Sequence, residues 1–185
     1  DRTVVVDNAS DDGTAEWLAS QSGIEVIRQS NQGSAGGFHA GIAAAIGGGA
    51  DWVWLMDDDT IPAVDALAQM LDHPTSRDPG TAFVCSFVRW RDGTPHHMNC
   101  PRVEPDYLPL HAALATSALP VESCSFVSLL VRAAAVRAAG LPRKEMFIWG
   151  DDVEFTLRLR RQGKGYQVLD SHVEHRTREN HSVDF

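Results

Sequence analysis

The chain has 185 residues, of which 43% are hydrophobic, and its formal net charge is -9. This length fits one domain with a substantial core, and no apolar run approaches the length of a membrane-spanning helix. The acidic balance argues against nucleic-acid binding, because the basic side chains form only one short cluster near residues 158–164. Three widely spaced cysteines favour a reducing compartment over a disulfide framework.

The first fifty residues alternate apolar runs with small-residue segments. We expect strands at Thr3–Val6 and Ile24–Arg28, each followed by a helix, the first ending near Ser20 and the second near Ile46. The second helix opens in a glycine-dense segment, residues 31–41. Such glycines let a backbone approach a ligand closely, or let a helix pack tightly on a sheet, and the sequence leaves both interpretations open. The segment contains neither a nucleotide P-loop nor a GxGxxG motif.

The segment Asp51–Thr60 joins an apolar run to three carboxylates. Its run of large apolar residues predicts a central strand of a parallel sheet, covered on both faces. Asp57 and Asp59 are two residues apart in extended chain, so both could ligate one Mg²⁺ or Mn²⁺ at the sheet edge where ligands bind. The alternative is a solvated turn in which Asp59 or Thr60 caps a helix that starts near Pro62.

The remaining sequence continues the alternation. We expect helices at Ala63–Leu71, Arg132–Ala139 and from Asp151 to about Gln162, and strands at Thr81–Val88, Ser125–Val131 and Tyr166–Leu169. This order predicts an α/β fold with a Rossmann-like, mostly parallel sheet flanked by helices.

Two further segments carry polar side chains. Residues 91–120 have little periodicity and predict a long functional loop with acceptor contacts, in which adjacent His96 and His97 are expected to be solvated rather than metal-bound. Asp151 as the N-cap of a helix, with Glu154 three residues later, approximates a capping box. That explanation does not extend to Asp152.

Four segments in order across residues 4–158 resemble one family. The segments VVVDNASDDGT, NQGSAGGFHAGI, WLMDDDT and FIWGDDVEFTLR are similar to those of the family 2 inverting glycosyltransferases of the GT-A fold. The versions NQGSAGGF and WGDDVEF resemble bacterial galactofuranosyl and rhamnosyl transferases that build cell-wall and surface polysaccharides. The resemblance implies one catalytic domain over residues 1–185 that lacks the first strand and helix with which such enzymes begin.

The resemblance also implies a donor and metal site. Asp57 and Asp59 match the DxD pair, and His175 matches the histidine that completes the metal site, with His172 as the second choice. Asp7 matches the aspartate that contacts the nucleotide base or ribose. Imidazole with carboxylates suits Mn²⁺ somewhat better than Mg²⁺.

The same resemblance implies that Asp152 is the catalytic base. Its place at a helix start favours the anion and gives no reason to expect a strongly raised pKa. Trp149 and Asp151 are expected beside it at the substrate, and Gly36 and Gly37 are expected to line the donor-sugar pocket.

The implied function is inverting transfer of a sugar from a UDP-galactofuranose or dTDP-rhamnose type of donor to a saccharide or lipid-linked acceptor. The implied location is the cytoplasm, with a position at the inner face of the plasma membrane, peripheral membrane association and homo-oligomer formation left open. One alternative is a phosphoryl-transfer enzyme of the haloacid dehalogenase kind, although Ile61 stands where that motif has Thr or Val. The other is a noncatalytic remnant that binds nucleotide sugars.

Overall fold

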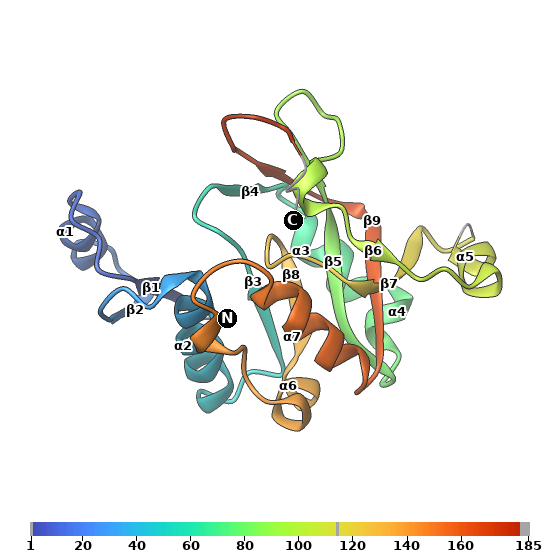
Figure 1. Cartoon of the computed structure of the whole chain (residues 1–185), viewed down its shortest axis with the longest axis horizontal. Coiled ribbons are helices and arrows are strands. Elements are labelled where there is room, and N and C mark those ends of the chain that lie inside the picture. The colour runs from blue at the N-terminus through green and yellow to red at the C-terminus, as the bar shows by residue number, and fades with distance from the viewer. Residues whose placement is uncertain (1, 114, 182–185) are drawn as a thin grey trace.

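The structure is a computed structural model that describes residues 2–113 and 115–181. Within these residues the strands form a two-stranded sheet, β1-β2, and a seven-stranded sheet of order β3-β8-β5-β9-β7-β6, with β4 paired to β9 (Figure 1). The strands are β1 (Thr3–Asp7), β2 (Ile24–Arg28), β3 (Trp52–Leu55), β4 (Thr60–Pro62), β5 (Thr81–Arg89), β6 (Arg102–Val103), β7 (Ala118–Ser123), β8 (Leu129–Arg132) and β9 (Lys164–His175). The helices are α1 (Thr14–Ala19), α2 (Gly33–Gly47), α3 (Ala66–Asp72), α4 (Pro74–Arg77), α5 (Tyr107–Ala113), α6 (Ala133–Ala139) and α7 (Asp151–Arg160), with short 3-10 turns η1 (His97–Asn99) and η2 (Lys144–Met146).

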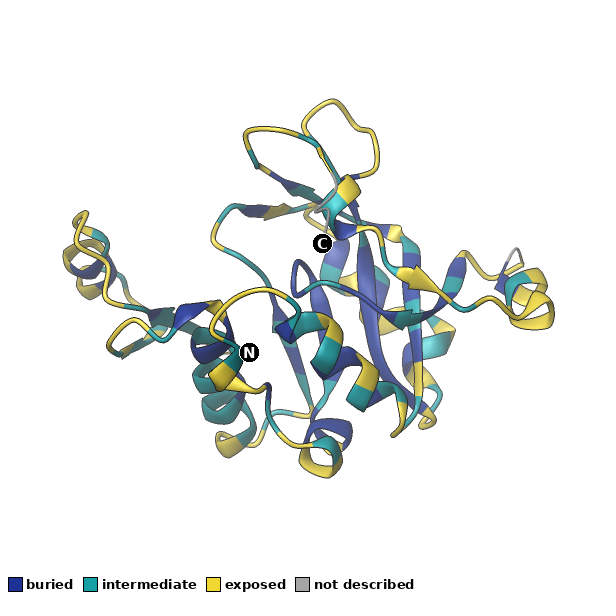
Figure 2. Cartoon of the chain, viewed as in Figure 1, coloured by how far each residue is buried: buried dark blue, intermediate teal, exposed yellow. Residues whose placement is uncertain are grey.

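Helices cover both faces of the larger sheet. On one face α2, α6 and α7 pack on the strands in a core that includes Phe83 and Phe155. On the other face α3 packs against Val84 and Val168 through Met70. Consecutive residues of β5 thus enter opposite cores, as the two-residue repeat of a strand requires. Figure 2 shows the buried strands between helices whose outer surfaces are exposed.

The larger sheet is mixed, so the prediction of a mostly parallel sheet is wrong. Within the described residues, β5 and β9 are its parallel pair, while β3-β8, β5-β8, β4-β9, β7-β9 and β6-β7 are antiparallel. The β3 strand lies at an edge rather than at the centre. Its apolar pattern has another cause: Val53 and Leu55 face the α2 side, and Trp52 and Trp54 pack on the α3 side. A strand that is apolar on both faces is covered by a layer on each side, but the pattern does not show that the strand lies at the centre of the sheet.

The last strand, β9, is longer than the predicted Tyr166–Leu169, and its additional residues include His175. The pairing of β5 with β9 shifts register after Ser86, so that residues 169–171 of β9 bulge. Ser86 Oγ lies 2.6 Å from Ser128 Oγ and 2.7 Å from Ser171 Oγ, which satisfies buried polar groups at the irregularity. Beyond the bulge β9 pairs with β4, with Thr60 opposite His175. The pairing with β4 therefore places the end of β9 next to the acidic turn.

Residues 91–120 are not one long loop. They contain η1, β6, α5 and the start of β7, which the sequence pattern did not predict. The predicted strand at Ser125–Val131 begins only at Leu129, because residues 124–128 form a turn in which Ser128 has a φ of 58°. In the described part of the chain, no helix is both long and apolar enough to cross a membrane.

The first two strands stand apart from the larger sheet. β1 and β2 pair in parallel with each other, and α1 contacts β2. Figure 1 shows this arm extending from α2 away from the seven-stranded sheet. The α2 helix, which contacts both β1 and β3, joins the arm to the rest of the molecule.

Candidate active site

The acidic segment after β3 is a turn followed by a strand. The Thr60 N–H donates to the Asp57 carbonyl at 3.2 Å, and β4 begins at once. The next helix starts only at Ala66, with Asp65 at its N-cap. The expectation that Asp59 or Thr60 caps a helix near Pro62 is therefore wrong, because the chain is committed to pairing with β9 at these residues.

Asp57, Asp59 and His175 converge on one point. A carboxylate oxygen of each aspartate and a ring nitrogen of the histidine all lie within 4.8 Å of one another. His175 Nε2 is 3.0 Å from Asp59 Oδ1, and His175 is buried. Two carboxylates and an imidazole form a ligand set that fits Mn²⁺. The structure thus assembles the three side chains that the sequence placed in a metal site.

The electrostatics of Asp57 favour a cation at this point. The pKa of Asp57 is raised from 3.8 to about 7, mainly by burial and then by the nearby charges of Asp59, Asp58 and Asp152 in that order of importance. Crowded, partly desolvated carboxylates are costly when ionised together. A divalent cation would offset that cost, so the charge of the site as well as its geometry fits one.

A second layer of side chains holds His175. Its Nδ1 lies 2.8 Å from Asn99 Oδ1, and Asn99 Nδ2 donates to Ser125 Oγ at 2.9 Å. The His96 ring packs against the His175 ring at 4.7 Å between centroids, with 38° between the ring planes, and His96 Nε2 lies 2.8 Å from Thr177 Oγ1. Asn99 and Ser125 carried no signal in the sequence, because η1 lies in a stretch without periodicity.

The expectation for the adjacent histidines is half right. His97 is exposed, but His96 is 1% exposed, and burial followed by the charge of His175 lowers its pKa to about 4. His172, the second choice for the metal, does not join the site. Because it stands three residues before His175 in a strand, it faces the other side, where it accepts from Arg89 Nη2 at 3.1 Å. Burial, and then the Arg89 charge, lowers the His172 pKa.

The start of α7 differs from the predicted capping box. Gly150, with a φ of 77°, is the N-cap, and Asp151 is already inside the helix and 4% exposed. Among the described residues Asp151 Oδ2 has no hydrogen-bond partner, and burial raises its pKa. Glu154 does not reach back to the cap; it binds Arg158 Nε at 2.8 Å and Arg143 Nε at 3.0 Å.

Asp152 lies in the first turn of α7. Its Oδ1 accepts from the Val153 N–H at 2.7 Å. Its pKa is nevertheless raised to about 6, mainly by burial and to a lesser extent by the Asp151 charge, while the Val153 hydrogen bond lowers it. The expectation that the Asp152 pKa would not be strongly raised is therefore wrong, because desolvation outweighs the hydrogen bond. Its charge also contributes to the raised pKa of Asp57, which places it within electrostatic reach of the three converging side chains.

The loop before Asp152 lies against the start of α2. Gly33 has a φ of 68°, and a Cβ there would collide with the Phe147 carbonyl. That carbonyl accepts from the Ala35 N–H at 3.1 Å. Glycine is therefore required at position 33 because the backbone there packs closely on the backbone of Phe147. Trp149, which has a φ of 73° and is half-exposed, lies in the same loop.

The predicted donor residues on α2 and β1 show mixed surroundings. A Cβ at Gly36 would collide with Gln32, whereas a Cβ at Gly37 would meet nothing within 4 Å. Asp7 ends β1 in the smaller sheet, where it accepts from the Ser10 N–H at 2.9 Å and pairs with Arg28 Nε at 3.2 Å. The Ser10 hydrogen bond is the main cause of its lowered pKa. The structure thus places Asp7 in a different sheet from the other acids.

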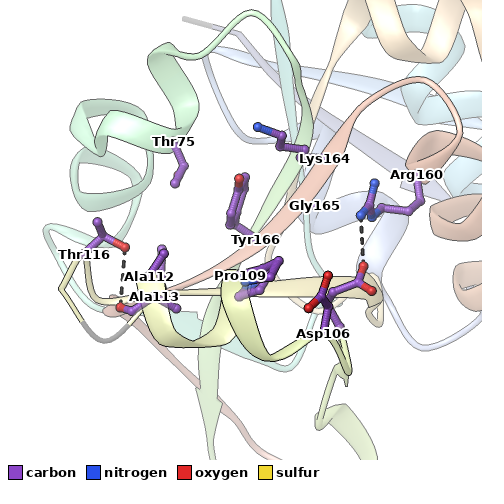
Figure 3. A pocket seen from close by; sticks show the side chains of 13 residues that line it. Thr75, Asp106, Pro109, Ala112, Ala113, Thr116, Arg160, Lys164, Gly165 and Tyr166 are labelled. Atoms are coloured by element: carbon purple, nitrogen blue, oxygen red, sulfur yellow. Dashed lines mark hydrogen bonds and ion pairs between the residues drawn. The ribbon is translucent and has the colours of Figure 1, made fainter.

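A cavity of about 520 Å³ lies at the opposite end of β9 from His175 (Figure 3). Its wall includes α5 and the first residues of β9, and the lining residues Arg160 and Glu104 form an ion pair with 3.0 Å between their charged groups. None of the predicted site residues lines it. The candidate active site is therefore the group of side chains at the β4-β9 end of the sheet.

Comparison with known proteins gives a family match. The sequence profile described as glycosyl transferase family 2 matches residues 1–135. The chain is 32% identical over 176 residues to the galactofuranosyltransferase GlfT1 of Mycolicibacterium smegmatis, covering 88% of this chain and 57% of that protein. It is 34% identical over 184 residues to the galactofuranosyltransferase GlfT1 of Mycobacterium tuberculosis, covering 88% of this chain and 56% of that protein. The chain thus spans little more than half the length of these relatives.

Two solved structures show a similar fold. GalNAc-T7, crystallised with UDP, GalNAc and Mn²⁺, aligns with a TM-score of 0.74 at 15% identity, covering 96% of this chain and 38% of that one. The mannosyltransferase PcManGT of Pyrobaculum calidifontis, in complex with GDP-Man and Mn²⁺, aligns with a TM-score of 0.64 at 18% identity, covering 94% and 47%. These alignments confirm the GT-A fold that the sequence predicted.

Proposed function

The chain belongs to glycosyl transferase family 2, and on that premise we propose that it transfers a hexose from a nucleoside-diphosphate donor to a saccharide or lipid-linked acceptor with inversion at the anomeric carbon. The observation that carries the proposal is the convergence of Asp57, Asp59 and His175 within electrostatic reach of Asp152. Metal ligands for a diphosphate and a carboxylate for an acceptor hydroxyl are the two parts that such a transfer needs.

Asp57, Asp59 and His175 form the donor side of the proposed site. The chemistry that a divalent cation supplies when held there is neutralisation of the charge that the departing nucleoside diphosphate gains. The two carboxylates and the imidazole would hold that cation, and the burial of His175 restricts the orientation of that ligand. The solved neighbours that hold UDP or GDP-Man together with Mn²⁺ support Mn²⁺ as the ion.

Asp152 is the proposed base. The acceptor hydroxyl forms a bond to the anomeric carbon, the bond from that carbon to the diphosphate oxygen breaks, and the hydroxyl proton passes to Asp152. A pKa of about 6 leaves the carboxylate ionised at neutral pH yet close enough in basicity to accept a proton. Its place on a helix rather than on a loop holds it steady relative to the sheet.

Galactofuranose is the proposed donor sugar, carried as UDP-galactofuranose. Its support is the match at 32% and 34% identity to galactofuranosyltransferases, which favours it over the rhamnose donor that the sequence left open. Because the chain covers 57% and 56% of those relatives, the activity and acceptor of a whole protein remain part of the proposal.

A transfer assay tests the proposal. The chain is incubated with Mn²⁺, an alkyl galactofuranoside and either UDP-galactofuranose or dTDP-rhamnose, and the product is followed by mass and by its anomeric proton. We expect transfer of galactofuranose with inversion, lost in Asp152→Asn and kept in Asp58→Asn, which changes an exposed acid in the turn between β3 and β4. Transfer from dTDP-rhamnose alone would overturn the donor assignment, and a product of retained configuration would overturn the role of Asp152. No transfer together with no Mn²⁺-dependent binding of UDP or dTDP would refute the proposal as a whole.

A further inference from the structure

We propose that Asn99 is a positioning residue for the metal site: its side-chain carbonyl holds the proton of His175 on Nδ1, so that the Nε2 lone pair faces Asp57 and Asp59. The inference rests on the proposed function, since it concerns the ligand set for the donor's cation. It adds a residue from the segment 91–120, which the sequence assigned to acceptor contacts.

The geometry leaves the ring between two oxygen atoms. Asn99 Oδ1 lies 2.8 Å from Nδ1, and Asp59 Oδ1 lies 3.0 Å from Nε2. Both partners are acceptors, whereas a neutral imidazole carries one proton. With that proton donated to Asn99, the Nε2 position toward the carboxylates is the one left for a cation. Metal-ligating histidines are commonly fixed in this way by a hydrogen bond at the other ring nitrogen.

Ser125 completes the orientation of the amide. Asn99 is 6% exposed, and its Nδ2 donates to Ser125 Oγ at 2.9 Å, which leaves Oδ1 turned toward the ring. The reversed amide would set its N–H groups against Nδ1 and require the ring proton on Nε2, where it would block the cation. The chain from Asp59 through His175 and Asn99 to Ser125 therefore links the β4-β9 end of the sheet with the turn before β8.

His96 restricts the same ring from its face. It is 1% exposed, its ring packs at 4.7 Å from the His175 ring, and its own Nε2 is held by Thr177. This contact restricts movement of the His175 ring but does not select which nitrogen carries the proton. That selection falls to Asn99, which is the contact at Nδ1.

The test compares two substitutions at one position. In Asn99→Leu the acceptor is lost with little change of volume, and we expect Mn²⁺ affinity, measured with saturating UDP by the signal of free Mn²⁺, to fall about 10- to 100-fold. Asn99→Asp keeps an acceptor oxygen and should bind Mn²⁺ at least as tightly as the unsubstituted chain. His97→Leu, at an exposed neighbour in the same turn, should leave the affinity unchanged. Equal losses in the Leu and Asp variants, or a Leu variant within twofold of the unsubstituted chain, would overturn the inference.

A spectroscopic readout separates positioning from general damage. In the ¹⁵N-labelled chain loaded with Mg²⁺ and UDP, the His175 Nδ1 proton should appear as a slowly exchanging signal that is missing from Asn99→Leu. Ser125→Ala is the second variant: it should weaken Mn²⁺ binding less, and Asn99→Asp should remove that effect, because a carboxylate has no N–H to orient. A protected Nδ1 proton that persists in Asn99→Leu, or a Ser125→Ala effect unchanged by Asn99→Asp, would overturn it. Failure of the unsubstituted chain to bind Mn²⁺ with UDP would refute the proposed function as well, whereas the other outcomes refute only the role of Asn99.

Discussion

Ionised Asp57 should lower the free energy of unfolding of the metal-free protein. Its pKa rises from 3.8 to about 7 on folding, a difference of about three units at ~1.4 kcal/mol each, or about 4 kcal/mol once the carboxylate is ionised. Because the folded state holds the proton more tightly than the unfolded state, this cost is absent below pH 4. It grows as the pH rises through the interval between the two pKa values and is complete above pH 7.

The substitution Asp57→Asn removes that cost. We expect it to raise the free energy of unfolding by about 1–3 kcal/mol at pH 8, below the full value because the side chain keeps some contact with solvent. Near pH 5 the gain should shrink to about 1 kcal/mol or less, since Asp57 of the unsubstituted protein is then protonated. The assay is urea unfolding with EDTA at both pH values, with Asp58→Asn for comparison: because the exposed Asp58 charge is one of the smaller causes of the raised Asp57 pKa, its removal should give a smaller gain at pH 8 than Asp57→Asn does. A less stable Asp57→Asn protein at pH 8, or a gain independent of pH, would refute the reasoning.

Three more predictions follow from single contacts. Transfer activity should fall about tenfold per pH unit below the Asp152 pKa of about 6, a pH profile that would be contradicted by constant activity down to pH 5. Phe155→Ala should lower the free energy of unfolding by about 3–5 kcal/mol in urea titration, because the ring is fully buried between α7 and the sheet. A loss under 1 kcal/mol would contradict the packing of Phe155 in this core. Gly33→Ala should lower the melting temperature more than Gly37→Ala does, since only the first adds a Cβ that strikes the Phe147 carbonyl at positive φ. Equal melting temperatures for those two variants would contradict that packing.

Local patterns predicted the acidic site better than they predicted the sheet around it. The abrupt change from large apolar residues to carboxylates after Leu55 is a local signal, and the structure does place Asp57 and Asp59 together with His175. The strand order is a nonlocal property, and the apolar run of β3 looks the same at a covered edge as at the centre of a sheet. Nothing in that run could show that β8 would pair with it antiparallel.

Long-range hydrogen bonds account for the residues that were missed. Asn99 meets His175 across 76 positions of sequence, and Ser86, Ser128 and Ser171 meet where β9 bulges. Such contacts leave no periodic trace in the chain. The same holds for the Asp152 pKa: the helix-start position was readable, but the burial that raises the pKa depends on how α7 packs on the sheet.

The central claim is that Asp57, Asp59 and His175 hold a cation that clamps a nucleoside diphosphate. The most direct measurement is calorimetric titration of the chain with UDP, with and without Mn²⁺, on the unsubstituted protein, Asp59→Ala and the exposed neighbour control Asp58→Ala. The account predicts UDP binding that depends on Mn²⁺, is lost in Asp59→Ala and is kept in Asp58→Ala. UDP binding of equal strength without Mn²⁺, or equal binding by Asp59→Ala, would contradict it.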